Sequence, residues 1–158
     1  MVADPDERDL FPPLSYRVEN GASNQGSNFG ILAMIHHVSV GTNDVRRARA
    51  FYDAVLAVLG LRLLKHSDES ADYGVASVLF SIESPVDGNA ATAGNGVHIA
   101  FAAGTQAMVD QFYEVALQHG GRDAGAPGLR PKYNPNYYGA FVIDPDGNKI
   151  EAVTHSGT

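Results

Sequence analysis

The sequence predicts an α+β fold: two βαβββ modules that form a curved, cup-like mixed sheet with the helices on its outer face. The first observation behind this prediction is an internal repeat. His37 and His98 are each followed by a Phe-Tyr pair at offsets 14 and 15 and by a glycine at offset 23. The second is that each repeat places an alternating apolar stretch before a helix-like apolar stripe. A histidine that recurs in register implies two equivalent positions that face each other.

Most of the chain belongs to the two repeats, which we expect at 34–88 and 95–155 within one domain spanning 34–158. Residues 1–33 differ, because they are polar, rich in turn-forming residues and without apolar periodicity. We therefore predict a disordered or weakly ordered N-terminal leader. An apolar fraction of 44% over 158 residues is enough for a packed core.

The first repeat opens with an alternating stretch that predicts a strand, with Val38 and Val40 on one face and His37 on the other. The polar segment 42–44 is typical of a helix start, and the glycine at position 60 of a helix end. The remaining elements are expected to be a helix over 45–59 and strands over 61–66, 71–76 and 78–83.

The second repeat follows the same scheme. His98 lies on the opposite strand face from Val97, Ile99 and Phe101, and Thr105 is a plausible cap for the next helix. A stretch rich in glycine, proline and asparagine is expected to form a long loop over 121–136. The expected last strands are 137–143 and 148–153, which flank the hairpin turn Asp144-Pro-Asp-Gly147.

Strand parity alone places both histidines on the face away from the helices. Ser39, Gly41, Ala100 and Ala102 share that face, and such small side chains leave volume unfilled. Glu151, near the end of the second repeat, adds one carboxylate. Two imidazoles and one oxygen donor suit a divalent transition metal with open coordination positions.

The composition limits the classes of binding partner and the cellular location that we expect for the protein. Eighteen acidic residues against eleven basic ones give a net charge of −7, which argues against a nucleic-acid groove. No apolar run approaches membrane-spanning length and no basic-then-apolar leader opens the chain, so we expect no membrane contact and a cytoplasmic location. The chain has no cysteine, which excludes disulfides, thiolate metal sites and cysteine nucleophiles.

Several segments together resemble the vicinal oxygen chelate superfamily, which includes glyoxalase I, fosfomycin-resistance proteins, methylmalonyl-CoA epimerase and extradiol dioxygenases. The segments that carry the resemblance span about 34–154 and are Ile35-His-His-Val-Ser-Val40, Phe51-Tyr52, Leu59-Gly60-Leu61, Gly96-Val-His-Ile-Ala-Phe101 and Asp144-Pro-Asp-Gly-Asn-Lys-Ile-Glu151. The resemblance implies that His37, His98 and Glu151 bind one divalent ion per site, which is Fe, Mn, Ni, Co or Zn. It also implies a homodimer.

The sequence departs from particular members of that superfamily. Glyoxalase I has a fourth ligand, a glutamate at the end of the first repeat, for which the nearest candidate here is Glu83. We expect Glu83 to be either a site carboxylate, as ligand or general base, or a loop-end acid. Extradiol dioxygenases carry a histidine just before the Asp-Pro-Asp-Gly turn, and this chain has none there.

A basic and aromatic cluster lies in or beside the expected long loop. For any one of its tyrosines, packing that pins the loop is the simpler interpretation. As a group, the residues would recognise an anionic or aromatic substrate at the mouth of the cup. The five candidate substrate-binding residues are Arg130, Lys132, Tyr133, Tyr137 and Tyr138.

These features lead to three hypotheses about function. The first is a metal-dependent enzyme of the glyoxalase-like group, a lyase, isomerase or thiol-adding enzyme acting on a small molecule. Its metal would chelate vicinal oxygens of the substrate and stabilise an enediolate or similar oxyanion, with Glu151 and Glu83 as candidate catalytic residues. The alternative is a non-catalytic protein that sequesters a small molecule, as bleomycin-resistance proteins do. The third is a metal-binding fold whose activity is lost. An extradiol dioxygenase is less favoured than these three.

Overall fold

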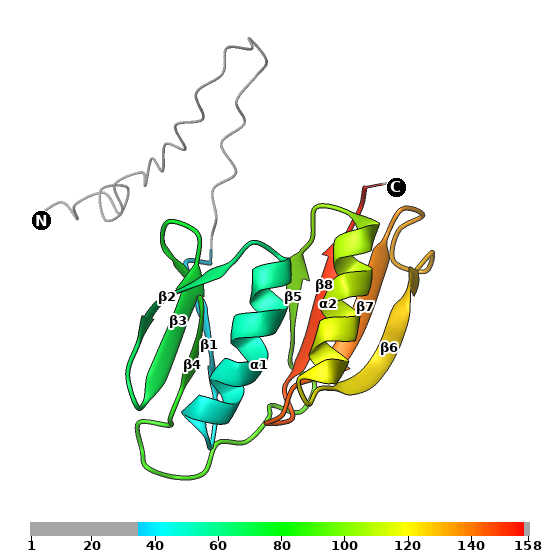
Figure 1. Ribbon diagram of the computed structural model, residues 1–158. Helices are drawn as coiled ribbons and strands as arrows, with labels where there is room; N and C mark the ends of the chain where they lie inside the picture. The colour runs from blue at the N-terminus through cyan, green and yellow to red at the C-terminus, as the bar shows by residue number, and fades with distance from the viewer. Residues whose placement is uncertain (1–34, 157–158) are drawn as a thin grey trace, which may run out of the picture. The chain divides into compact units, whose positions relative to one another are not determined.

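The computed structural model describes residues 35–156, and the predicted leader at 1–33 lies outside them. All the elements belong to the unit His36–Thr158 (Figure 1). In the first repeat they are β1 Val38–Gly41, α1 Val45–Val58, β2 Arg62–His66, β3 Ser70–Gly74 and β4 Val78–Glu83. In the second they are β5 His98–Ala102, α2 Gln106–Gln118, β6 Arg122–Leu129, β7 Tyr138–Ile143 and β8 Lys149–Thr154.

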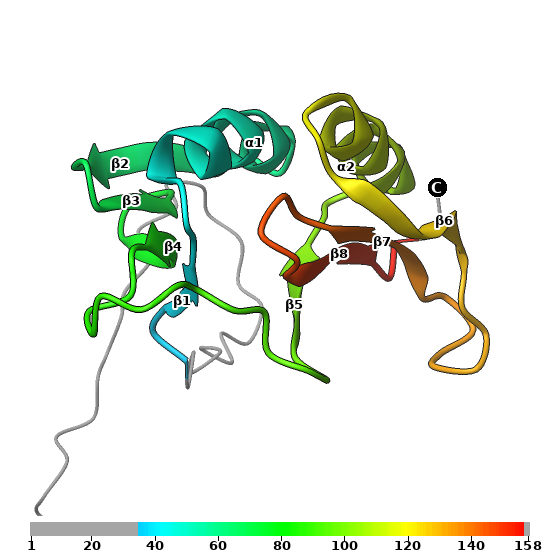
Figure 2. The same ribbon diagram turned by 90° about the horizontal axis from the view of Figure 1, so that it is seen from below.

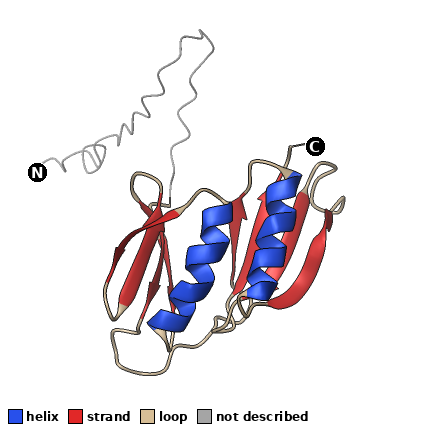
Figure 3. Ribbon diagram, viewed as in Figure 1, coloured by secondary structure: helices blue, strands red, loops and turns tan. Residues whose placement is uncertain are grey.

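The sheet topology confirms the two βαβββ modules and the α+β class. The strands form two four-stranded sheets, with orders β1-β4-β3-β2 and β5-β8-β7-β6, and the sheets are not closed into a barrel. In each sheet the first strand pairs in parallel with the last strand of its module, and the other pairs are antiparallel. Each helix covers one face of its own sheet (Figures 2 and 3), and no described helix covers the opposite face.

The two helices begin where the sequence predicts. The Asp44 side chain accepts a hydrogen bond from the backbone N–H of Arg47, and Thr105 caps α2 in the same way. The most buried side chains of both helices, which include Phe51 and Phe112, lie in one core shared by the two modules, whereas Leu117 near the end of α2 is 38% exposed. Among the described residues, no helix is long and apolar enough to cross a membrane.

Polar contacts also join the two modules. The buried carboxylate of Asp144 accepts a hydrogen bond of 2.7 Å from the Tyr52 hydroxyl of α1. Asp146 in the same turn accepts hydrogen bonds from the Thr42 hydroxyl and from the Arg47 guanidinium. The turn Asp144-Pro-Asp-Gly147 therefore does more than reverse the chain, because it also holds the N-terminal part of α1.

The expectation of a continuous loop over 121–136 was wrong. Arg122–Leu129 forms β6, which pairs with β7 through a register that shifts twice. Gly125, Pro127 and Gly128 gave a loop-like signal, but β6 lies at the edge of its sheet, where one side of the strand needs no hydrogen-bond partner. Proline and glycine are tolerated at such an edge. Only the segment after Leu129 remains a loop.

Candidate functional site

The register of β5 and β8 places a histidine and a carboxylate on the same sheet face. Ala100 is in register with Glu151, and His98 with Lys149. Ile99 and Ile150 alternate with them and pack toward the helix. The face away from α2 therefore carries His98, Lys149 and Glu151, as strand parity predicts.

His98 and Glu151 form the chemical centre of this face. The Nε2 atom of His98 lies 3.4 Å from Oε2 of Glu151. The imidazole is 48% exposed, whereas the carboxylate is only 1% exposed. A buried carboxylate is costly unless its oxygens have partners. The other oxygen, Oε1, accepts a hydrogen bond of 2.7 Å from the Tyr137 hydroxyl.

Tyr137, the residue before β7, positions this carboxylate through its hydroxyl group. Burial and the hydrogen bond to Glu151 raise the pKa of Tyr137 to about 12, so at neutral pH the phenol is protonated and donates. Its ring packs edge-on against Tyr133 and against His155, each at 5.2 Å between centroids. Tyr137 thus fixes one oxygen of Glu151 and leaves the other directed at His98.

Gly139 makes room for the same carboxylate, a role that the sequence analysis did not predict. A Cβ atom at this position would lie 2.7 Å from Oε1 of Glu151, closer than real carbon atoms approach. Gly139 lies on β7 in register with Val153, two residues beyond Glu151 on the same face. Strand parity would have placed Gly139 on the site face, but only the structure shows which atom occupies the space.

Phe141 and Lys149 were also missed. The Phe141 ring lies on the site face, in register with Glu151, and Lys149 reaches over it. Because Lys149 precedes Glu151 by two residues in a strand, alternation alone could have assigned it to the site.

His37 lies one residue before β1 and is exposed. Its Nδ1 atom lies 2.8 Å from Nδ1 of His36, so one imidazole of this pair donates and the other accepts. Within residues 35–156, no three His, Asp or Glu side chains are close enough together to hold a metal ion. The structure thus brings together His98 and Glu151, but not His37 with them.

Comparisons with known proteins agree with the fold and the strand pattern. A model of the Glyoxalase/Bleomycin resistance protein/Dioxygenase superfamily matches residues 34–152. The chain belongs to this superfamily. Among solved structures, it is similar to a glyoxalase/bleomycin resistance protein from Albidiferax ferrireducens T118, with 36% identity and a TM-score of 0.72 over 77% of this chain and 98% of that one.

More distant structures show the same fold. A glyoxalase-related enzyme from Fulvimarina pelagi has 18% identity and a TM-score of 0.62, and covers 77% of this chain and 88% of its own. A putative glyoxalase from Bacillus halodurans has 22% identity and a TM-score of 0.60, with 77% and 96% covered. A comparison with curated proteins returned no match.

The first sheet of this superfamily member differs from its second at the position equivalent to Glu151. Two residues after His37, Ser39 is in register with Ser81, just as Ala100, two residues after His98, is in register with Glu151. Ser81 therefore holds the equivalent place, and its hydroxyl donates to Asp72. Glu83 lies two residues after Ser81 on the same face of β4 and accepts a hydrogen bond of 3.0 Å from the Ser39 hydroxyl.

The five predicted substrate-binding residues are divided among the helix side of the second sheet, its site face and the loop before β7. Tyr138 packs on the helix side, where its hydroxyl donates to Asp110 of α2 and this bond raises its pKa. Tyr137 lies at Glu151, and Arg130 lies beside Phe141. Lys132 and Tyr133 are exposed in the loop before Tyr137.

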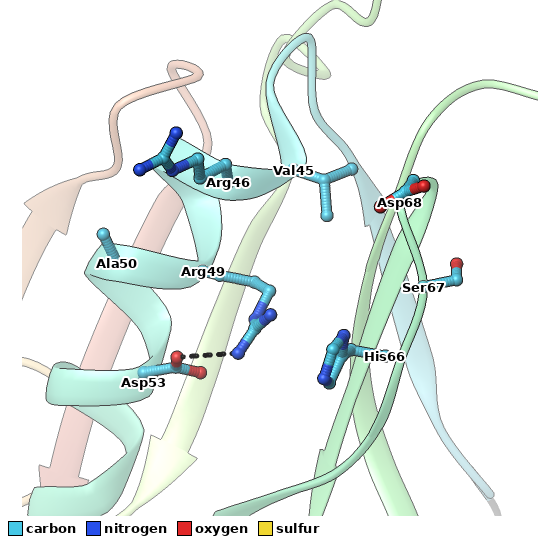
Figure 4. Close-up of a pocket in the computed structure, with 8 residues that line it drawn as sticks. All are labelled: Val45, Arg46, Arg49, Ala50, Asp53, His66, Ser67 and Asp68. Carbon is cyan, nitrogen blue, oxygen red and sulfur yellow. Dashed lines mark hydrogen bonds and ion pairs between the residues drawn. The ribbon is translucent and has the colours of Figure 1, made fainter.

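A larger cavity lies apart from this site. It has a volume of about 480 Å³ and is formed by α1 and the end of β2 (Figure 4). Arg49 and His66 point into it, and Arg49 is paired with Asp53 at 3.4 Å. Because Asp53 also accepts a hydrogen bond from the Tyr73 hydroxyl, we assign this pair to the packing of the helix on its sheet. His98 and Glu151, which the sequence predicts as site residues, lie instead on the face of the second sheet away from α2.

Proposed function

We propose that this protein is a divalent-metal-dependent enzyme of the glyoxalase-like group, a lyase or isomerase that acts on a small molecule with vicinal oxygens. The observation that carries the proposal is the pairing of half-exposed His98 with fully buried Glu151 on the open face of the second sheet. A neutral imidazole and a carboxylate are both ligands of first-row transition metals.

The donor set fits such an ion. Two ligand atoms that each lie about 2.1 Å from one ion, at a roughly tetrahedral angle, are about 3.4 Å apart. The separation of Nε2 of His98 from Oε2 of Glu151 is 3.4 Å. Tyr137 and Gly139 orient the carboxylate, which is the kind of outer support that metal ligands commonly have. Iron, manganese, nickel, cobalt and zinc all accept this set.

We propose that the third ligand is His37 of a second copy of the chain in a homodimer. β1 and β5 are both edge strands, since each pairs on one side only, with β4 and β8. Such edges are commonly covered by another chain. His37 precedes β1, so a partner whose β1 lies beside β5 would bring its histidine to the face of His98. We also propose a cytoplasmic location, which the cysteine-free sequence favours.

The chain's own residues would orient the substrate and move protons. Bound metal would supply Lewis-acid polarisation of the substrate oxygens. Tyr137, protonated at neutral pH, keeps Glu151 in place. Glu151 would serve both as a metal ligand and as a catalytic group. Glu83 would serve as the general base, and the Ser39 hydroxyl donates a hydrogen bond to one of its oxygens.

A second candidate function is sequestration of a small molecule without chemistry. The exposure of Ala100 and Ala102 favours it, because these small residues leave the site face open for a ligand. The two functions differ in whether the protein needs its metal-binding side chains. Loss of bound metal would leave a sequestering protein intact, whereas it would abolish turnover by the enzyme.

Elemental analysis of protein purified without chelator, before and after metal loading, tests the proposal. We expect one ion per chain, and loss of that ion in His37→Ala, His98→Ala and Glu151→Gln. The matched control is His66→Ala, an exposed histidine of β2 outside the site, which should retain the metal. No bound ion in the loaded wild type would reject the metal enzyme and favour the sequestering protein.

A further inference from the structure

Phe141 is surrounded by basic side chains on the site face of the second sheet. The Lys149 Nζ atom lies 4.7 Å from the centre of its ring, and Cζ of Arg130 lies 5.6 Å from it. The His98 ring lies 6.5 Å away, centroid to centroid. Two full positive charges therefore share one aromatic ring, immediately beside the histidine of the candidate centre.

Within residues 35–156, no ion pair balances this positive charge. Among the ion pairs that the described residues form, none involves Lys149 or Arg130. The nearby carboxylate, Glu151, is buried, accepts a hydrogen bond from Tyr137 and lies 3.4 Å from His98. A cation–π contact is weaker than an ion pair with a carboxylate or a phosphate, so the ring is a weak substitute for an anion. In a chain of net charge −7, this positive patch is a local exception.

Arg130 is held in place before any ligand arrives. Its Nη2 atom donates a hydrogen bond of 2.6 Å to the carbonyl oxygen of Ala126. The glycines of β6 let the guanidinium lie close to the strand, since a Cβ atom at Gly128 would be 3.2 Å from Nη1 and one at Gly125 would be 3.6 Å from Nη2. A guanidinium has five N–H donors in a fixed plane, and this carbonyl uses one.

A cavity lies at the Lys149 end of the patch. Its volume is about 340 Å³, and it is lined by segment 93–98 together with Gly147 and Lys149. His98 and Lys149 are neighbours in register on adjacent strands, so a molecule in this cavity would contact both. Glycines make up much of the wall, which lets a ligand approach the main chain. The volume is at the lower end of the range for small-molecule sites.

From this patch we infer that the substrate carries an oxyanion group, a carboxylate or a phosphoryl group, which binds to Lys149 and Arg130. The rest of the molecule then extends over Phe141 toward His98 and Glu151. The inference rests on the proposed function for the reacting end of the substrate. The anion site itself consists only of protein groups, so it can be tested without a metal ion.

The test is calorimetric titration of metal-free, full-length protein at low ionic strength, where charge interactions are least screened. Malonate is the carboxylate probe, inorganic phosphate the phosphoryl probe, and malonamide the neutral probe of similar shape. We expect malonate or phosphate to bind, with malonamide at least about tenfold weaker, and the better of the two anions identifies the group. Lys149→Met and Arg130→Met should each weaken the anion about tenfold, and Lys149→Arg should retain it.

Two controls separate this inference from its alternatives. Lys65→Met removes the same charge from an exposed lysine of β2 and should leave anion affinity unchanged. His37→Ala should lose the proposed metal but retain the anion, so the two proposals can fail independently. Equal binding of malonate and malonamide would overturn the inference. So would equal losses in Lys149→Met and Lys65→Met, or binding of neither anion at millimolar concentration.

Discussion

Replacing Tyr52 with phenylalanine removes one hydroxyl group from the contact between the two modules. Tyr52 is 1% exposed, and its hydroxyl donates to Oδ2 of Asp144 at 2.7 Å. Burial and the neighbouring Asp144 raise the pKa of Tyr52 well above its usual value, so the phenol is the donor throughout the neutral range. A hydrogen bond to a charged group contributes about 1.5–3 kcal/mol to stability.

The lower part of that range applies here, because Asp144 keeps other donors after the substitution. Its Oδ2 atom still accepts from the Asn148 side chain, and its Oδ1 atom from the backbone N–H groups of Asp146 and Asn148. The carboxylate is therefore not left without partners. We expect Tyr52→Phe to lower the free energy of unfolding by about 1.5–2 kcal/mol and Tm by roughly 3–8 °C.

Urea denaturation followed by circular dichroism is the assay, with thermal unfolding as a second measurement. The internal repeat offers a matched control: Tyr113 holds the same offset from His98 that Tyr52 holds from His37, but it is only partly buried. Tyr113→Phe should change stability much less, and neither variant should change the denaturant slope. Equal losses in the two variants, or no loss in Tyr52→Phe, would refute the argument from burial and pairing.

Four further predictions concern the site. Gly139→Ala should weaken metal binding at least about tenfold by displacing Glu151, as measured by competition with a chelating dye. Tyr137→Phe should weaken metal binding about 10–100-fold in the same assay, and unchanged affinity would exclude its positioning role. The folded-state pKa of Tyr137 is raised to about 12, so its protonated form stabilises the wild type fully below pH 10 and this contribution is lost between pH 10 and 12. In urea titrations, the decrease in stability over this pH range should therefore be smaller in Tyr137→Phe than in the wild type. Metal removal by chelation should lower Tm in the wild type and leave Tm of His37→Ala unchanged, since an ion stabilises only the folded state that binds it.

The local sequence predicted most of the fold because each helix and most strands have short-range signals. The helix starts at Asp44 and Thr105 follow from side chains that cap their own helix. Alternation placed His98 and Glu151 on one face, which the register bears out. β6 was missed because its glycines and proline carry no alternating apolar pattern, and its strand conformation comes from pairing with β7.

The neighbours of each site residue could not be predicted in the same way. Parity assigns a residue to a face, but it does not say which side chains from other strands meet there. The space at Gly139 that Glu151 fills, and the position of Lys149 over Phe141, depend on strand register and loop length. For the first repeat, register was decisive, since it placed Ser81 rather than Glu83 opposite Ser39.

The contact between Tyr52 and Asp144 also bears on how the protein unfolds. Each module supplies a buried polar group whose partner belongs to the other, and their apolar side chains form one core. If one module opened alone, the Asp144 carboxylate would lose a donor and the shared core would be exposed to water. Residues 36–156 should therefore unfold in a single cooperative transition, and the internal repeat does not amount to two independently folding units.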